Sequence, residues 1–301
     1  MHALGNYILR GRLQAIAVIS FLSIFSLLLP ALAYLMSGVP VALVSLRRGG
    51  LIGIQVITGS LFMTLLLTLL MHITPPVALA FALGIWAPIW CCSMVLRKTE
   101  SQGLLVLTCG AAGMLFIVLM YAFMGDVPAW WKTWLDAWIE SSFTAGRADE
   151  YKQIFAAAVP LMNAMMASGI VISLVLTTLI ARWWQALLIN PGLFKKEFYA
   201  LRIPRVLCYP TSVGVIILLL NSDLQHSMLR DLLIVMVFLY MFQGVSAIHR
   251  IVSWRKLSLA WLVGMYGLLL LLPQMVLIIA CIGMADSWLA GGKQFGGKNN
   301  S

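Results

Sequence analysis

The chain has 301 residues, of which 62% are hydrophobic and only 10% are charged, and its mean hydropathy is +0.97. A soluble domain carries about 25% charged residues and a disordered chain is poor in apolar ones, so both classes are excluded. The net charge is +10, but the basic residues lie sparsely between apolar runs and form no long stripe. This distribution argues against nucleic-acid binding and indicates a lipid bilayer as the surroundings.

Nine apolar segments follow one another along the chain. The runs are continuously apolar rather than alternating, which indicates transmembrane helices of about 20 residues and not barrel strands. We therefore expect an all-α fold, a polytopic transmembrane helical bundle of eight to nine membrane segments, organised as a single domain over residues 1–301. The segments lie at roughly 13–29, 31–46, 51–71, 75–96, 104–124, 156–181, 206–222, 232–248 and 257–283.

The first two segments form an uncharged stretch from Leu13 to Leu46. This stretch is too long for one straight crossing and short for two full ones. Pro30 and the stretch 37–40 supply natural breaks. We favour a hairpin of two short or tilted helices. One bent helix, or a re-entrant segment 31–46 that never reaches the far side, are the alternatives.

The positions of Lys and Arg predict the orientation, because basic residues concentrate in cytoplasmic loops. We place the N-terminus in the cytoplasm and the C-terminus outside, with a disordered tail at 291–301. Nine crossings then leave fourteen of the twenty basic residues inside and six outside, namely Lys132, Arg147, Lys152, Arg230, Lys293 and Lys298.

The external connection 125–155 contains a Trp-rich stretch from Pro128 to Glu140. Trp130, Trp134 and Trp138 recur every four residues and predict an amphipathic helix in the plane of the interface, where indole rings favour the headgroup level. We interpret this helix as an aromatic anchor. A lid over an outward-facing cavity is the alternative.

The cytoplasmic connection 182–205 is centred on a strong turn signal at Asn190, Pro191 and Gly192. Phe194, Phe198 and Leu201 then recur at helical spacing, with basic residues on the other side. This pattern predicts a short amphipathic helix that binds anionic headgroups or docks a partner. The candidate interface residues are Trp184, Asn190, Pro191, Gly192, Lys195, Lys196, Glu197 and Arg202.

The same stretch carries a resemblance to a known family. Its pattern from Arg182 to Arg202, Arg-Trp-Trp-Gln-x-x-Leu-x-Asn-Pro-Gly-x-Phe-x-x-Glu-Phe-x-x-Leu-Arg, and the opening Arg10-Gly-Arg-Leu-Gln-Ala resemble the bacterial membrane-protein family DUF2232 (YybS-like). That family has no settled activity and is grouped with the substrate-binding (S) components of energy-coupling-factor vitamin transporters. The resemblance implies a transporter-like bundle in the bacterial cytoplasmic (inner) membrane, with separate energising subunits as possible partners. It assigns no functional residue.

Catalytic motifs are absent from the sequence. No charged residue falls inside an apolar segment, since Asp223, Arg230 and Asp231 lie at segment ends. The chain lacks a P-loop, a His-Glu-x-x-His motif and a Gly-x-Ser-x-Gly motif, and its five cysteines lack zinc-finger spacing. We therefore expect no enzymatic activity, no cofactor and no metal.

Uncharged polar residues within the segments are the remaining candidates for a site. A buried amide in hydrocarbon is costly unless it is satisfied, so these residues should face the interior. They are weak candidates for a pocket that binds a neutral solute, and hydrogen bonding between helices is the alternative. The candidates are Asn163, Gln243, Gln274, Tyr209 and Gln55.

Two functions fit these observations. The first is a transport-related solute-binding bundle that resembles an S component and works with separate energising subunits. The alternative is a non-transporting scaffold or assembly factor that recruits a partner through the loop 182–205. A cavity lined by the amides would favour the first function, and a solid interior would favour the second.

Overall fold

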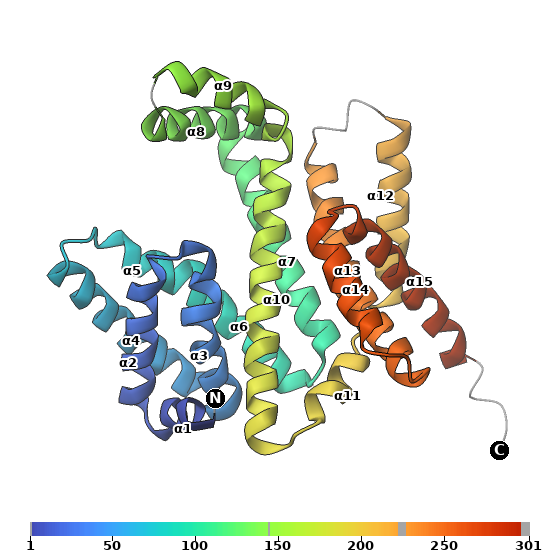
Figure 1. Cartoon of the computed structure of the whole chain (residues 1–301), viewed down its shortest axis with the longest axis horizontal. Coiled ribbons are helices and arrows are strands. Elements are labelled where there is room, and N and C mark those ends of the chain that lie inside the picture. Colours follow the sequence, from blue (N-terminus) through green and yellow to red (C-terminus); the bar gives the residue numbers. More distant parts are fainter. Residues whose placement is uncertain (1, 144, 222–226, 296–301) are drawn as a thin grey trace. The chain divides into compact units, whose positions relative to one another are not determined.

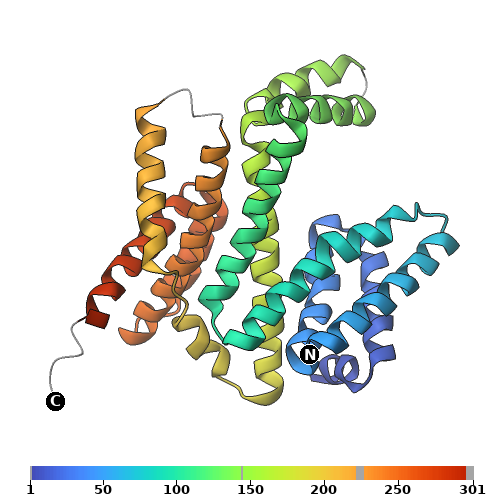
Figure 2. The same ribbon diagram turned by 180° about the vertical axis from the view of Figure 1, so that it is seen from behind.

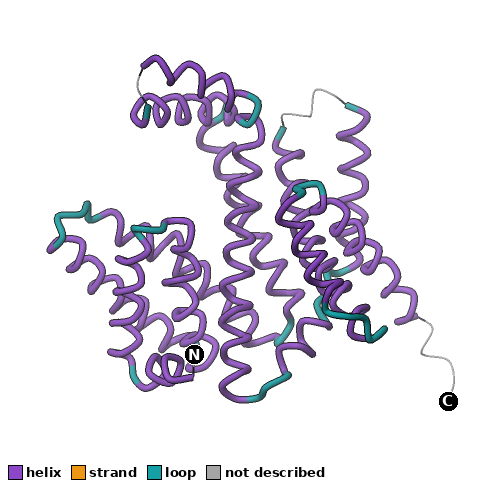
Figure 3. Tube along the Cα trace, viewed as in Figure 1, coloured by secondary structure: helices purple, strands orange, loops and turns teal. Residues whose placement is uncertain are grey.

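The computed structural model describes residues 2–143, 145–221 and 227–295, and no strand occurs among these residues (Figure 3). The chain forms two compact units. Unit 1 comprises Met1–Cys109 and Ile172–Arg202, and unit 2 comprises Gly110–Val171 and Ile203–Ser301. Two long helices, α7 and α10, contribute residues to both units.

Unit 1 is built from the N-terminal helices and the end of α10. Its members are α1 (His2–Arg10), α2 (Arg12–Ser26), the 3-10 turn η1 (Pro30–Leu32), α3 (Ala33–Arg48), α4 (Gly50–Leu70), α5 (Pro76–Ala80), the π-helical segment η2 (Phe81–Trp86), α6 (Ala87–Thr99), the start of α7 (Gln102–Met124), the end of α10 (Met162–Ile189) and α11 (Leu193–Tyr199) (Figure 1).

Unit 2 contains the remainder of α7 and α10, which run side by side with Gly113 against Ala167 and Val171 (Figures 1 and 2). Its other members are α8 (Val127–Ser142), α9 (Ala145–Ala156), η3 (Val159–Leu161), η4 (Arg205–Leu207), α12 (Cys208–Leu220), α13 (Met228–Trp254), α14 (Ala260–Leu271) and α15 (Met275–Phe295).

Several helices have the length and composition of membrane spans, which confirms the polytopic helical bundle. Three shorter apolar helices accompany them, at Arg205–Leu220, Ala260–Leu271 and Met275–Leu289. The pair α1 and α2, bent by 120°, counts as a sixth possible span. The five full-length spans in the described residues are Gly50–Leu70, Pro76–Thr99, Gln102–Met124, Val159–Ile189 and Met228–Trp254.

The uncharged N-terminal stretch forms two short helices, α2 and α3, which pack together on either side of a break at Pro30. Their crossing of the membrane stays a prediction. The second expected break, at 37–40, is wrong because α3 continues through Pro40. Close packing holds the helix across the missing hydrogen bond of this proline. A Cβ at Gly38 would lie 2.3 Å from Cδ1 of Ile89, and Trp86 Nε1 donates to Ser37 Oγ at 3.2 Å.

The last predicted segment, 257–283, is two helices rather than one. α14 ends at Leu271 and α15 begins at Met275, with Pro273 between them. A proline disfavours the helical conformation in the residue before it, and Leu272, directly before Pro273, is extended with φ −125° and ψ 99°. α15 extends to Phe295, five residues into the tail that the sequence suggested is disordered, and residues 296–301 lie outside the described part. The expected external C-terminus depended on 257–283 crossing once.

Two glycines let α15 cross α13 at backbone contact. A Cβ at Gly244 would lie 1.9 Å from the carbonyl oxygen of Ile279, and one at Gly283 would lie 2.0 Å from that of Tyr240. Glycine is the only residue without a Cβ, so this approach requires it at both positions.

Candidate functional site

The turn between α10 and α11 has the conformation that its sequence predicts. α10 ends at Ile189, where Asn190 N donates to Ala186 O at 2.8 Å. Gly192 has φ +102°, a left-handed conformation that side chains disfavour. The predicted short helix follows as α11, and the rings of Phe194 and Phe198 stack with centroids 5.9 Å apart.

An ion pair holds α11 against α10. Arg182 Nε donates to Glu197 Oε2 at 2.9 Å and Arg182 NH2 donates to Glu197 Oε1, while Arg182 NH1 donates to Gln185 Oε1 at 2.8 Å. The Arg182 and Glu197 side chains are only 12% and 10% exposed. A bidentate arginine–carboxylate pair fixes orientation as well as distance, so the turn has a defined shape.

Six of the eight predicted interface residues are exposed and two are internal. Trp184 is buried and contacts the backbone position of Gly5 in α1, and Glu197 is engaged by Arg182. These two residues shape the turn from within. The exposed residues are Asn190, Pro191, Gly192, Lys195, Lys196 and Arg202.

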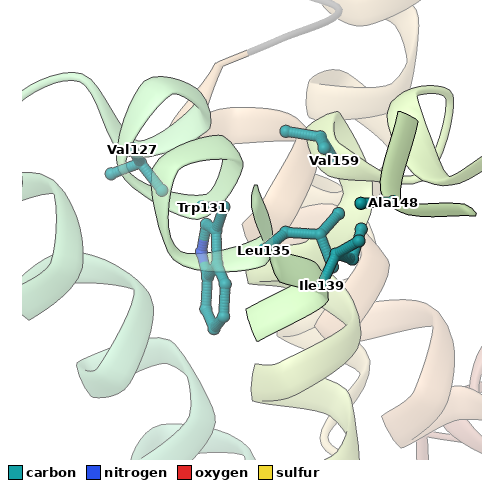
Figure 4. Packing of buried hydrophobic residues seen from close by; sticks show 6 residues of the cluster. All are labelled: Val127, Trp131, Leu135, Ile139, Ala148 and Val159. Carbon is teal, nitrogen blue, oxygen red and sulfur yellow. The ribbon is translucent and has the colours of Figure 1, made fainter. Parts of the chain in front are cut away.

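The Trp-rich connection forms the helix pair α8 and α9, and the side of α8 that packs inside the protein is not the side that carries Trp134 and Trp138. Val127, Trp131, Leu135 and Ile139 are buried together with Ala148 of α9 and Val159 (Figure 4). Aliphatic side chains accompany Trp131 on this face. Burying this face therefore removes more apolar surface from water than burying the face of Trp134 and Trp138 would. Trp134 and Trp138 are 45% and 46% exposed.

Ion pairs at the polar surface of α8 and α9 are exposed. Lys132 pairs with Asp136 at 2.7 Å within α8. Lys152 of α9 pairs with Glu140 of α8 at 2.6 Å, and this hydrogen bond raises the pKa of Lys152.

A buried polar cluster in unit 2 is centred on Asp231, whose side chain is 1% exposed. Asn163 Nδ2 donates to Asp231 Oδ2 at 2.8 Å, Tyr121 OH donates to the same oxygen at 3.3 Å, and Arg230 pairs with Oδ1 at 2.9 Å. This site was not predicted from the sequence, because both charges lie at the end of an apolar segment. The sequence signal that could have indicated this site is the adjacent pair Arg230-Asp231 near the start of a helix. Trp131 Nε1 donates to Asn163 Oδ1 at 3.4 Å and links α8 to the cluster.

A second polar cluster surrounds Gln243, which is fully buried. Its Oε1 accepts from Ile203 N at 2.9 Å and from Ser287 Oγ at 3.0 Å, and its Nε2 donates to Asp286 Oδ2 at 3.1 Å. Arg250 pairs with the other oxygen of Asp286. Protein groups therefore engage both ends of this amide.

The other predicted solute contacts do not join these clusters. Tyr209 is 49% exposed and its ring lies 5.3 Å from that of Trp288. Gln274 is exposed in the break between α14 and α15, and Gln55 is exposed on α4 in unit 1. Two cavities, of about 640 and 310 Å³, are lined by apolar side chains and by none of the five candidates.

Unpartnered buried polar atoms of the described residues lie mainly inside unit 1, and those in unit 2 are Ser168 Oγ and Arg205 Nε. Buried side-chain polar groups usually have a hydrogen-bond partner, so a set without one indicates water or a ligand. No residue of the described part forms a hydrogen bond with the side-chain polar atoms of Ser45, Ser60, Thr64, Ser93, Gln102, Thr177 and Thr178. Within the same described residues, no three His, Cys, Asp or Glu side chains gather as a metal site.

Comparison with known proteins identifies the family. The profile of the family described as "Predicted membrane protein (DUF2232)" matches residues 15–287. The chain belongs to the DUF2232 family. The match includes the stretch 182–202 that carries the resemblance and reaches both units of this DUF2232 protein. No curated protein and no solved structure matches the chain. The fold relation to S components stays a prediction.

Proposed function

We propose that this DUF2232 protein is a non-transporting membrane scaffold or assembly factor that recruits a partner at the α10–α11 turn, on the cytoplasmic side of the bacterial inner membrane. The ion pair between Arg182 and Glu197 carries the proposal, because it gives an exposed basic turn a fixed shape. Recognition by a preformed surface avoids the entropy cost of ordering a loop on binding.

The engaged amides support this function over solute binding. Asn163 and Gln243 are the two buried candidates for a polar pocket, and both are hydrogen-bonded to protein groups. A solute that used them would have to break these bonds. Among the described residues, no ion pair engages the exposed Lys195, Lys196 or Arg202 of this region, and Lys195 Nζ lies 5.5 Å over the ring of Tyr199.

The apolar side of α11 favours a protein partner over lipid anchoring. A helix that lies in the interface inserts its apolar face among the acyl chains. In this chain Leu201 is fully buried, and Phe194 and Phe198 are partly buried. The exposed side carries Lys195 and Lys196, which suits an acidic protein surface.

Photo-crosslinking from the turn tests the proposal. We expect a crosslinking amino acid at Lys195 or Lys196 in living cells to yield one dominant protein adduct. The same amino acid at Lys132, a 66% exposed lysine of α8, is the matched control and should not yield it. Arg182→Gln should weaken the adduct because it releases α11. Lipid adducts alone, or the same adduct from Lys132, would contradict the proposal.

The unpartnered hydroxyls of unit 1 favour a second candidate, a transport-related solute-binding bundle with separate energising subunits as partners. Hydroxyls on α3, α4, α6 and α10 suit a neutral polar solute. Thermal-shift screening of vitamins and metabolites tests it, since a ligand at 100 times its Kd adds about 2.7 kcal/mol to stability. The shift should disappear in Ser93→Ala and Thr177→Val. A flat screen, with no energising subunit copurified, would remove this candidate.

A further inference from the structure

An apolar groove of about 640 Å³ lies in unit 2 among α13, α14 and α15, which are adjacent in Figure 1. Its volume is in the range of small-molecule pockets. The lining is aliphatic and aromatic, and includes Ile251, Leu257, Trp261, Met265 and Ile278. The α10–α11 turn contributes no residue to the groove, and nothing in the proposed function uses the groove.

A glycine leaves open space within this lining. A Cβ at Gly264 of α14 would meet no atom within 4 Å. His249 and Tyr266 join α13 to α14 through a hydrogen bond of 2.9 Å. The groove therefore lies between helices that contact each other directly. Small side chains on these helices, and not a gap between the helices, leave its space open.

Two basic residues stand at one end of the groove. Arg255 and Lys256 are exposed and lie between Val252 and Leu257, which both line it. No ion pair involves either residue in the part of the chain that the structure describes. The Arg255 guanidinium lies 5.0 Å over the ring of Trp254.

Exposed tryptophans place this end of the groove at headgroup level. Trp254 is 76% exposed and Trp261, itself a lining residue, is 65% exposed. Exposed indoles of membrane proteins gather at the interface between hydrocarbon and water. Basic residues beside them meet the phosphates of the lipids.

We propose that the groove binds one anionic glycerophospholipid of the surrounding bilayer. An acyl chain occupies the apolar space beside Gly264, and the negatively charged headgroup lies at Arg255 and Lys256. An apolar cleft with two uncompensated cations at one end matches a molecule with an apolar tail and an anionic head. A zwitterionic lipid matches only the apolar part.

Native mass spectrometry of the delipidated full-length protein tests the proposal, with phosphatidylglycerol and phosphatidylcholine of equal chain length as probes. We expect one phosphatidylglycerol per chain, retained roughly tenfold better than phosphatidylcholine. The double variant Arg255→Gln/Lys256→Gln should lose this preference and keep the weaker binding of both lipids. Equal retention of the two lipids by the unaltered protein would overturn the headgroup assignment.

Two glycines of α14 provide a matched pair for the acyl chain. Gly264→Leu should fill the groove and reduce retention of both lipids about tenfold. Gly267 also has no atom within 4 Å of a built Cβ but does not line the groove, so Gly267→Leu should retain lipid normally. Ala260→Leu, at another lining position, replaces Gly264→Leu if that variant does not fold. Wild-type retention in the groove variants, or equal loss in Gly267→Leu, would overturn the proposal.

Discussion

Asp231 shows how single residues link elements that are distant in sequence. A buried carboxylate is costly unless charges and hydrogen bonds compensate for its lost hydration. Arg230, Asn163 and Tyr121 provide this compensation. They come from three helices of unit 2, namely α13, α10 and α7. The arrangement ties α7, α10 and α13 together at one point.

We predict that Asp231→Ala lowers the free energy of unfolding by about 3–5 kcal/mol, because it breaks a buried ion pair with Arg230 and removes the acceptor of the Asn163 and Tyr121 side chains. Denaturant unfolding in detergent measures the change. Asp136→Ala is the control, since it removes an exposed pair with Lys132 and should cost no more than about 0.5 kcal/mol. Similar losses in the two variants would show that the cluster is not structural.

The sequence predicted the burial of two amides, Asn163 and Gln243, but not their roles, and it was wrong for Gln55 and Gln274, which are exposed. Asn163 and Gln243 are interior, as expected for amides in apolar segments. Their partners Asp231 and Asp286 lie 68 and 43 positions away along the chain. Hydropathy indicates that a buried polar group needs a hydrogen-bond partner, but it does not indicate which partner. Amides that bind other protein groups and amides that line a solute pocket therefore have the same sequence pattern.

Helix α8 shows the same limit at the scale of an element. The spacing of Trp130, Trp134 and Trp138 predicted an amphipathic helix but did not indicate which side packs inside the protein. The packing partners decide it, and they include Phe116 and Met120 of α7. The α10–α11 turn was predicted closely, because Asn-Pro-Gly specifies a backbone conformation locally.

We predict that Trp131→Ala destabilises the protein by about 3–5 kcal/mol and that Trp134→Ala changes stability by about 0.5 kcal/mol or less. The first indole is 4% exposed and the second 45%. Hydrogen exchange of residues 127–142 should accelerate only in Trp131→Ala. Faster exchange in Trp134→Ala would mean that the other face of α8 carries its packing.

The crossing of α13 and α15 gives a second prediction for an element. Gly283→Ala should lower stability by about 1–3 kcal/mol, because its Cβ would meet the carbonyl oxygen of Tyr240. Gly267→Ala on α14 meets open space and should be neutral or stabilising by about 1 kcal/mol. Thermal unfolding of both variants distinguishes the two sites. Equal behaviour would contradict the close crossing.

At the scale of the whole molecule, hydropathy predicted the membrane bundle but not its C-terminal path. Five of the nine expected segments are full-length spans, and the others are short helices or a broken pair. Pro273 lies within a continuously apolar run, so hydropathy alone did not indicate that the helix breaks there. The division into two units has no signal in composition, because tertiary packing and not hydropathy produces it.

We predict that the C-terminus lies on the same side of the membrane as Arg250, which reverses the expectation from a single crossing. Asp286 pairs with Arg250, and Ser287 Oγ donates to Ile203 O at 2.9 Å. Both partners adjoin basic stretches that the charge distribution places in the cytoplasm. A fluorescent protein fused after Ser301 should fluoresce, and alkaline phosphatase fused there should be inactive. Active phosphatase would contradict this prediction and support the external C-terminus expected from a single crossing.

The side of the membrane on which the α10–α11 turn lies tests the proposed docking role most directly. In a variant without native cysteines, Asn190→Cys and Lys132→Cys report on the turn and on α8 respectively. We predict that a membrane-impermeant maleimide labels position 132 in spheroplasts and labels position 190 only after the membrane is permeabilised. Labelling of position 190 in intact spheroplasts would place the turn outside and contradict a cytoplasmic docking surface.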